Sequence, residues 1–186
     1  MKQTSVSAAM VEPYAEALMS IAQTHHLTHQ IGEDVESILS LLLSSSELQA
    51  FLVNPFVKAE GKKTVLRQIL QGQVQGYFFN FLMLLVDRRR TFLLEAICQH
   101  YKALLRQLNN TVLAKVTSTV ELSDHQRQQI IEKVKQMTNA AQVELETSLD
   151  PDLIGGVIIK VGSQVLDASI RGQLRRISTS LMNPAA

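Results

Sequence analysis

The chain has 186 residues but only one cysteine, Cys98, so it cannot form an internal disulfide. It also lacks a cluster of cysteines that could hold zinc or an iron–sulfur centre, so packing alone must stabilise the fold. Neither sign of charge is in excess, because 18 Lys and Arg residues stand against 17 Asp and Glu residues, a net charge of +1. This balance excludes a polybasic, histone-like protein and gives no global attraction for nucleic acid.

Long hydrophobic runs are also absent. The most apolar stretch, residues 77–86, falls short of the roughly 18 residues that cross a bilayer, so it predicts a buried helix. Near the N-terminus, Glu12 and Glu16 interrupt any apolar core, and no leader rich in Arg and Ser is present. Neither end carries a lipidation motif. We therefore expect neither secretion nor import as a precursor, and membrane association only through a partner.

Hydrophobic residues make up 46% of the chain and charged residues 19%, which excludes global disorder. Since one core usually serves roughly 100 to 150 residues, we expect two small lobes. Up to residue 110 the apolar residues recur at helical spacing, which predicts six helices. The predicted apolar stripe of the first helix is Met10, Tyr14, Ala17, Leu18 and Ile21. Residues 77–86 are apolar nearly all round, which predicts a helix surrounded by the others.

After residue 110 the apolar period becomes that of β-strands. The predicted strands are residues 112–120, 143–149, 157–161 and 164–167. Ser123 and Gln126 form a capping box that opens a helix after the first strand, and Gly162-Ser163 predicts a tight hairpin between the last two. A final helix carries Ile170 and its apolar neighbours on one face. The predicted fold class is α+β: an N-terminal six-helix bundle followed by a small α+β lobe with about four strands and two helices.

Charge is distributed unevenly along the chain. Residues 1–57 carry a net charge of −5, residues 58–110 one of +6, and the remainder is balanced. The basic clusters are Arg88, Arg89 and Arg90 at the end of the fifth helix, and Arg171, Arg175 and Arg176 on the last. Arginines at a helix C-terminus interact favourably with the helix dipole, and an acidic protein partner is the alternative explanation. Nucleic acid is disfavoured because the aromatic residues occur at spacings that point inward.

No group of residues predicts an active site. His25 and His29 lie one helical turn apart beside His26, but no third ligand completes a zinc site. Gly155-Gly156 precedes a strand, whereas a phosphate-binding loop opens a helix. Cys98 lies among apolar residues without a histidine partner, which predicts a buried thiol. We therefore expect no catalytic residue, no cofactor and no metal.

One segment resembles the signature of the delta-subunit family of F-type ATP synthase, whose mitochondrial counterpart is the oligomycin-sensitivity-conferring protein. The segment is VELETSLDPDLIGGVIIKVG, residues 143–162. Other segments are similar to the family's first helix, to the joint between its fifth and sixth helices, and to its closing helix: EPYAEAL from Glu12, LLVDRRRTFLLEAI from Leu84, and DASIRGQLRRI from Asp167. The resemblance covers nearly the whole chain, and the triple arginine is similar to the chloroplast and cyanobacterial branch.

The resemblance implies a non-catalytic stator subunit that links the catalytic alpha/beta hexamer to the peripheral stalk, so that rotor torque is resisted and proton flow is coupled to ATP synthesis. Residues 1–108 would be a six-helix bundle that binds the alpha subunit N-terminus, and residues 111–186 would be an α+β domain that contacts the b and b-prime subunits. The implied location is the cytoplasmic face of the thylakoid membrane, or the stromal face in a chloroplast.

The family's groove for the alpha segment lies between the first and fifth helices, and the matching positions are Tyr14, Leu18, Leu84 and Val86. The implied contacts with the b subunits are Arg171, Arg175 and Arg176. Two other classes remain open. A free-standing helical adaptor would use the same lobes on another partner, and a small enzyme would need a polar pocket with perturbed titratable groups.

Overall fold

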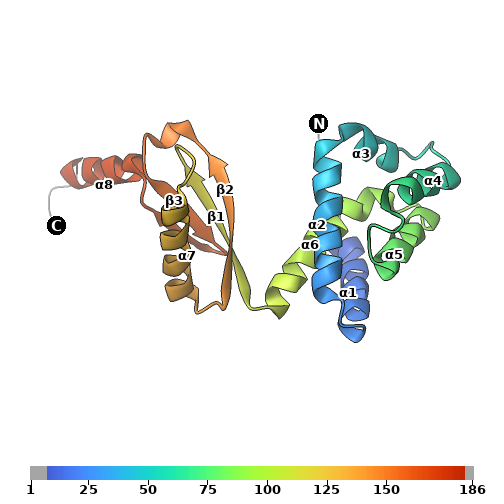
Figure 1. Cartoon of the computed structure of the whole chain (residues 1–186). Helices are drawn as coiled ribbons and strands as arrows, with labels where there is room; N and C mark the ends of the chain where they lie inside the picture. The colour runs from blue at the N-terminus through green and yellow to red at the C-terminus, as the bar shows by residue number, and fades with distance from the viewer. Residues whose placement is uncertain (1–7, 183–186) are drawn as a thin grey trace. The chain divides into compact units, whose positions relative to one another are not determined.

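The computed structural model describes residues 8–182 and has the α+β architecture that the sequence predicts (Figure 1). The chain divides into two compact units, Met1–Leu105 and Arg106–Ala186. Each unit has its own cluster of buried apolar side chains. No single helix in the described part of the chain is long and apolar enough to cross a membrane, and the one pair that would suffice together is bent by 102° between its helices.

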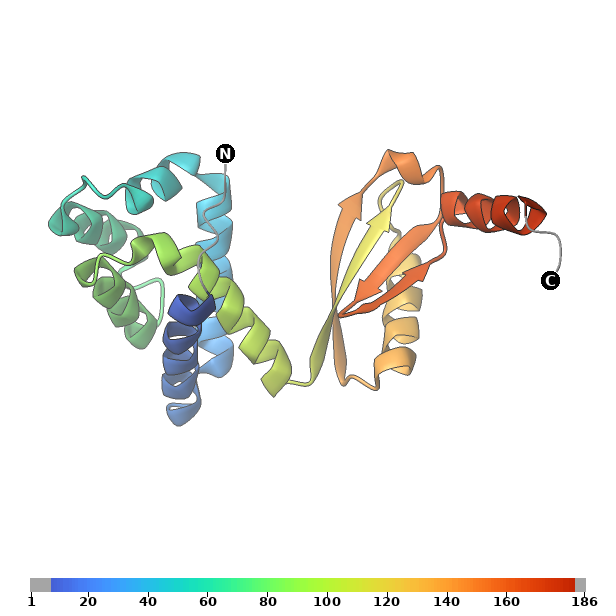
Figure 2. The same cartoon turned by 180° about the vertical axis from the view of Figure 1, so that it is seen from behind.

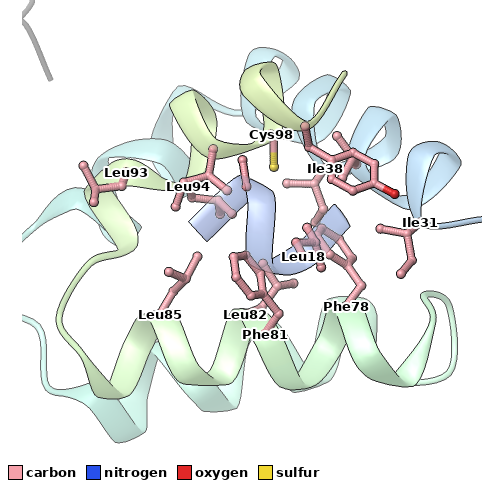
Figure 3. Close-up of a cluster of buried hydrophobic side chains, with 14 of the residues drawn as sticks. Leu18, Ile31, Ile38, Phe78, Phe81, Leu82, Leu85, Leu93, Leu94 and Cys98 are labelled. Carbon is pink, nitrogen blue, oxygen red and sulfur yellow. The ribbon is translucent and has the colours of Figure 1, made fainter. Parts of the chain in front are cut away.

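The first unit is helical throughout its described residues. Its elements are α1 (Ala8–Thr24), α2 (Thr28–Ser44), α3 (Ser46–Val53), α4 (Ala59–Leu70), α5 (Gly76–Asp87), the short 3-10 helix η1 (Thr91–Leu93) and α6 (Leu94–Leu108). Figure 3 shows Phe78, Leu82 and Leu85 pointing from α5 into the core, where they meet Leu18 of α1 and Cys98 of α6. One face of α5 thus supplies a large apolar side chain to the core on every turn, which joins the helices around it.

A buried lysine joins three elements on another side of this unit. Nζ of Lys62 in α4 donates to the carbonyl of Leu52 at 2.5 Å and to the hydroxyl of Thr91 at 3.2 Å. The Thr91 hydroxyl donates in turn to the same carbonyl. Burial lowers the pKa of Lys62. The network fixes the start of η1 against α3 and α4, and so fixes the corner that follows α5.

The second unit is a four-stranded sheet with one helix packed on it, as both views show (Figures 1 and 2). Its described elements are β1 (Thr111–Ser118), α7 (Asp124–Thr138), β2 (Gln142–Leu149), the 3-10 turn η2 (Pro151–Leu153), β3 (Val157–Val161), β4 (Gln164–Asp167) and α8 (Ile170–Met182). The strand order is β2-β1-β3-β4, with β1 parallel to β2 and the other pairs antiparallel. The four predicted strands are confirmed, two of them to the residue.

The local signals in this unit act as the sequence predicts. The Ser123 hydroxyl accepts the N–H of Gln126, and the Gln126 side chain accepts the N–H of Ser123 at 2.9 Å, which is a complete capping box. In the β3–β4 hairpin only the first turn residue, Gly162, has a positive φ, 56°. A type II′ turn requires a positive φ at that position, so the glycine sets the turn and the turn sets the register.

The glycine pair of the signature segment serves close packing. Gly156 has a φ of 80°, and a Cβ there would overlap the carbonyl oxygen of Ala168 and approach Cα of Ser169 to 2.9 Å. Beside it, the N–H of Ile170 donates to the carbonyl of Gly155 at 2.9 Å. The chain therefore passes directly against the junction of β4 and α8, and only a residue without a side chain fits at position 156.

Candidate partner-binding surfaces

The helices α1 and α5 lie side by side and run in opposite directions. Tyr14 meets the ring of Phe81 edge-on, with ring centroids 6.4 Å apart. His25, just after α1, stacks on Tyr77 with centroids 4.3 Å apart. His25 follows Tyr14 in the chain, whereas its partner Tyr77 precedes Phe81, so the two helices are antiparallel. Their faces therefore lie next to each other.

Two apolar stripes run along α1, and the bundle buries one of them. The buried stripe is Val11, Ala15, Leu18, Met19 and Ala22. The second stripe is exposed at Met10, Ala17 and Ile21 and half-buried at Tyr14. The predicted apolar stripe is therefore uncovered or half-buried except at Leu18, because the neighbouring helices pack against the adjacent face of α1, which carries Val11, Ala15, Met19 and Ala22.

One face of α5 is also uncovered, so the prediction that other helices surround it is wrong. Tyr77 and Leu84 are each 44% exposed, and Asn80 between them is exposed as well. Residues spaced by three, four and seven positions share a helix face, so these side chains form one stripe. The α1/α5 surface, as we name it, consists of Met10, Tyr14, Ile21, Tyr77 and Leu84. It is an exposed apolar strip shared by two antiparallel helices.

Two of the four predicted groove residues lie on this surface. These two are Tyr14 and Leu84. The other two are buried, because the exposed fraction is 0% for Leu18 and 2% for Val86. Val86 follows Leu84 by two positions, which places it on nearly the opposite side of the helix. Leu18 and Val86 are therefore core residues that a partner cannot contact without opening the bundle. Tyr77, whose spacing predicts an inward side chain, is instead on the surface, as are Met10 and Ile21 of the predicted apolar stripe. The only signal in the sequence for this surface is that α1 carries apolar residues on two stripes.

Arg90 closes one end of the α1/α5 surface. The helix α5 ends in a turn in which Arg89 has a φ of 55° and the N–H of Arg90 donates to the carbonyl of Leu85 at 2.8 Å. This turn directs the Arg90 side chain back to α1, where Nη1 donates to the Tyr14 hydroxyl at 2.7 Å. Its Cζ lies 5.3 Å from the centre of the Tyr14 ring, a cation–π distance. Arg90 therefore holds the Tyr14 side chain in place.

The last helix of the second unit presents another uncovered apolar stripe. Its first turn is fixed by Asp167, whose carboxylate accepts the N–H of Ser169 at 2.9 Å and its hydroxyl at 2.6 Å. These hydrogen bonds lower the pKa of Asp167. From there α8 extends without lying across either face of the sheet (Figures 1 and 2). Ile170, Leu174 and Ile177 share one side of it and are between 43% and 56% exposed.

The predicted arginines lie elsewhere on α8. A Cβ at Gly172 would overlap the Asp167 carboxylate, so the Gly172 side of the helix faces its own unit. Arg175 and Arg176 flank that side, and Nη2 of Arg175 is 3.9 Å from Asp167. Arg171 is exposed at the edge of the apolar stripe. The outermost surface of α8 is therefore apolar, and the three predicted arginines lie at its edge and on its flanks.

Cys98 and Asp34 are two titratable groups of the helical unit whose pKa values are raised. Burial, and then the charge of Glu95, raises the pKa of the Cys98 thiol to about 12, so this thiol is not a nucleophile at neutral pH. Asp34 accepts the N–H of Gln75 at 2.7 Å, which satisfies the start of α5, and burial raises its pKa. Within residues 8–182 no three or more His, Cys, Asp or Glu side chains are grouped so that they could hold a metal.

Comparison with known proteins gives one consistent result. The family model described as ATP synthase delta (OSCP) subunit matches residues 10–181. The chain is 66% identical to ATP synthase subunit delta of Acaryochloris marina over 97% of this chain and 98% of the relative. It is 55% identical, with the same coverage of both chains, to ATP synthase subunit delta of Synechocystis. It also resembles a chain in the mitochondrial ATP synthase hexamer of Toxoplasma gondii, with a TM-score of 0.74 and 26% identity over 93% of this chain and 97% of that one.

Proposed function

This chain belongs to the ATP synthase delta (OSCP) subunit family. We propose that one of its two uncovered apolar surfaces binds the alpha/beta hexamer and the other binds the peripheral stalk. As a member of the family it is a stator subunit of the F-type ATP synthase, linked to the peripheral stalk. We assign the α1/α5 surface to the N-terminal segment of an alpha subunit, and thereby to the alpha/beta hexamer. We assign α8 to the b and b-prime subunits of the stalk.

The observation that carries the first assignment is the shape of the α1/α5 surface. Two antiparallel helices present five apolar or aromatic side chains along one shared strip. An amphipathic helix laid along such a strip buries its own apolar face and leaves its polar face in water. A stator must resist torque without dissociating, and a long helical contact of this kind spreads the load over many side chains.

Titration of the full chain with a peptide copied from the N-terminus of the alpha subunit should give saturable binding of one peptide. Tyr14→Ala and Leu84→Ala should each weaken binding by about 5- to 30-fold, because truncating a central apolar contact typically costs about 1–2 kcal/mol. Isothermal titration calorimetry measures both affinity and stoichiometry. The matched control is Leu43→Ala, since Leu43 is exposed on α2 outside the α1/α5 surface. No binding by a folded chain, or an equal loss with Leu43→Ala, contradicts the assignment.

For the second unit, the apolar stripe of α8 supports a helix-to-helix contact with the b subunits. Arg171, at the edge of the stripe, and Arg175 and Arg176 on its flanks would steer acidic side chains of the stalk, while Ile170, Leu174 and Ile177 would supply most of the binding free energy. In this arrangement the chain reaches the cytoplasmic face of the thylakoid membrane only as part of the complex.

Leu174→Glu should abolish recovery of the chain with the b subunits from detergent-solubilised thylakoid membranes, because it places a charge in the middle of the apolar contact. Gln128→Glu adds the same charge at an exposed position of α7, away from the α8 stripe, and we expect it to leave recovery unchanged. Helical circular dichroism should be equal for both variants. Retention of the Leu174→Glu chain at the wild-type level rules out this contact.

We also propose that the chain catalyses no reaction of its own. Cys98 is a buried thiol with a raised pKa, and the carboxylate of the half-buried Asp34 accepts the N–H of Gln75 at the start of α5. The purified chain should therefore hydrolyse no ATP above the background of the buffer. A free-standing adaptor is the remaining alternative, and it predicts that neither the alpha peptide nor the b subunits bind.

A further inference from the structure

One charged group lies at the α1/α5 surface and has no acidic partner. The guanidinium of Arg90 is exposed beside Tyr14, at the end of a strip whose other members are apolar or aromatic. Asp87 is the nearest acidic residue in the sequence, but its carboxylate is 2.6 Å from Nζ of Lys63. Among the described residues no carboxylate forms an ion pair with Arg90.

The geometry of Arg90 favours a planar anionic ligand. A guanidinium has five N–H donors in a rigid fork, and the Tyr14 hydroxyl accepts only one of them. The cation–π contact with the Tyr14 ring and the turn at Arg89 hold the side chain in place before any partner arrives. A carboxylate that binds there therefore meets an oriented fork and loses less conformational entropy than it would with a mobile arginine.

The corner that carries Arg90 is itself rigid. Thr91, which directly follows Arg90, is hydrogen-bonded to Lys62 and to the carbonyl of Leu52. Lys62 donates to the same carbonyl. The N–H of Leu93 donates to the carbonyl of Arg90 at 3.0 Å. The backbone on both sides of Arg90 is thus fixed, and so is the distance between its guanidinium and the apolar strip.

We propose that Arg90, oriented by Tyr14, is a carboxylate-binding site that selects a docking helix with an acidic side chain at the edge of its apolar stripe. This inference rests on the proposed function, because it concerns the segment that binds the α1/α5 surface. The apolar strip supplies contact area to any amphipathic helix. The Arg90 site fixes the register of the helix, because the carboxylate must lie beside Tyr14.

A double-mutant cycle on the full chain tests the site. The probes are the alpha N-terminal peptide and a set of copies in which each Glu is changed to Gln, or each Asp to Asn, one at a time. Arg90→Gln should weaken binding of the unchanged peptide by about 10- to 100-fold, the range expected for a lost charge-assisted pair. Against one particular amide peptide the same variant should cause almost no further loss. Arg90→Lys should recover only part of the affinity, since an ammonium cannot bind both oxygens as a fork.

Two controls separate recognition from positioning. Arg88→Gln removes a neighbouring exposed arginine that does not bond to Tyr14, and we expect less than about a threefold change by screened long-range attraction. Tyr14→Phe keeps the ring but removes the hydroxyl acceptor, and it should weaken binding while preserving the coupling to the same acidic residue.

The outcomes distinguish this inference from the proposed function. If the wild-type chain binds no peptide, the assignment of the α1/α5 surface fails, and the Arg90 site fails with it. If the wild-type chain binds but Arg90→Gln weakens every peptide equally, Arg90 only positions Tyr14 and the carboxylate site is overturned. Unchanged binding by Arg90→Gln overturns it as well. Circular dichroism and the unfolding midpoint of each variant show whether a loss comes from misfolding.

Discussion

Replacement of Gly156 with alanine is expected to remove a large part of the stability of the second unit. The added Cβ overlaps the carbonyl oxygen of Ala168 and crowds Cα of Ser169, and both are backbone atoms that cannot rotate away. The φ of 80° adds a cost of about 1–2 kcal/mol for any residue with a side chain, and the overlap adds about 1–3 kcal/mol more. A unit of this size has a total stability of roughly 4–12 kcal/mol, so the loss is a large part of it.

Limited proteolysis and hydrogen exchange resolved by unit measure this effect. We expect fast exchange in β1–β4, while the helical unit keeps its protection. Gly162→Ala is the matched control, because Gly162 also has a positive φ but nothing lies within 4 Å of its missing Cβ. Only the backbone cost should remain there, about 1–2 kcal/mol. Equal stability of the two variants would show that the close contact with the β4–α8 junction does not matter.

Cys98 and Tyr101 together should remove about 4 kcal/mol of stability from the helical unit between pH 8 and pH 11. Burial, and then the charge of Glu95, raises the pKa of Cys98 from 9.0 to about 12. Burial, and then the charge of Asp34, raises the pKa of Tyr101 from 10.0 to about 12. Below pH 9 both groups are protonated in the folded and the unfolded chain. Above their unfolded values only the unfolded chain releases the protons, so each group removes about 1.4 kcal/mol per pH unit.

Urea unfolding followed by helical circular dichroism, with a reductant present, gives this slope. Cys98→Ala removes one titrating group, so the stability of the variant should fall about 1.4 kcal/mol less per pH unit between pH 9 and 11. Tyr101→Phe keeps the ring but removes the hydroxyl that donates to the carbonyl of Thr28, and its curve should differ in slope only above pH 10. Burial lowers the pKa of Lys62, so this residue adds stability as the pH rises toward 10.5. It does so equally in all variants. Parallel curves for the wild type and Cys98→Ala would contradict the argument.

Local sequence determined much of this protein. The types and order of the helices and strands, the capping box at Ser123 and the hairpin at Gly162 all follow from short-range rules of periodicity and backbone geometry. The signature around Gly156 also identifies the family. Two backbone segments approach closely there, which requires a glycine, and a glycine can be read directly from the sequence. These features depend on residues within a few positions of one another, so a single sequence contains the information.

The tertiary structure alone decided which apolar faces are covered. Periodicity finds an apolar stripe on a helix but cannot say which of two stripes faces the core, and on α1 the choice depends on helices far along the chain. The same holds for the uncovered faces of α5 and α8, and for the burial of Leu18 and Val86 away from the α1/α5 surface. The pairing of Arg90 with Tyr14 joins residues 76 positions apart. Only the packing of the bundle brings them together, because no local rule links two side chains at that separation.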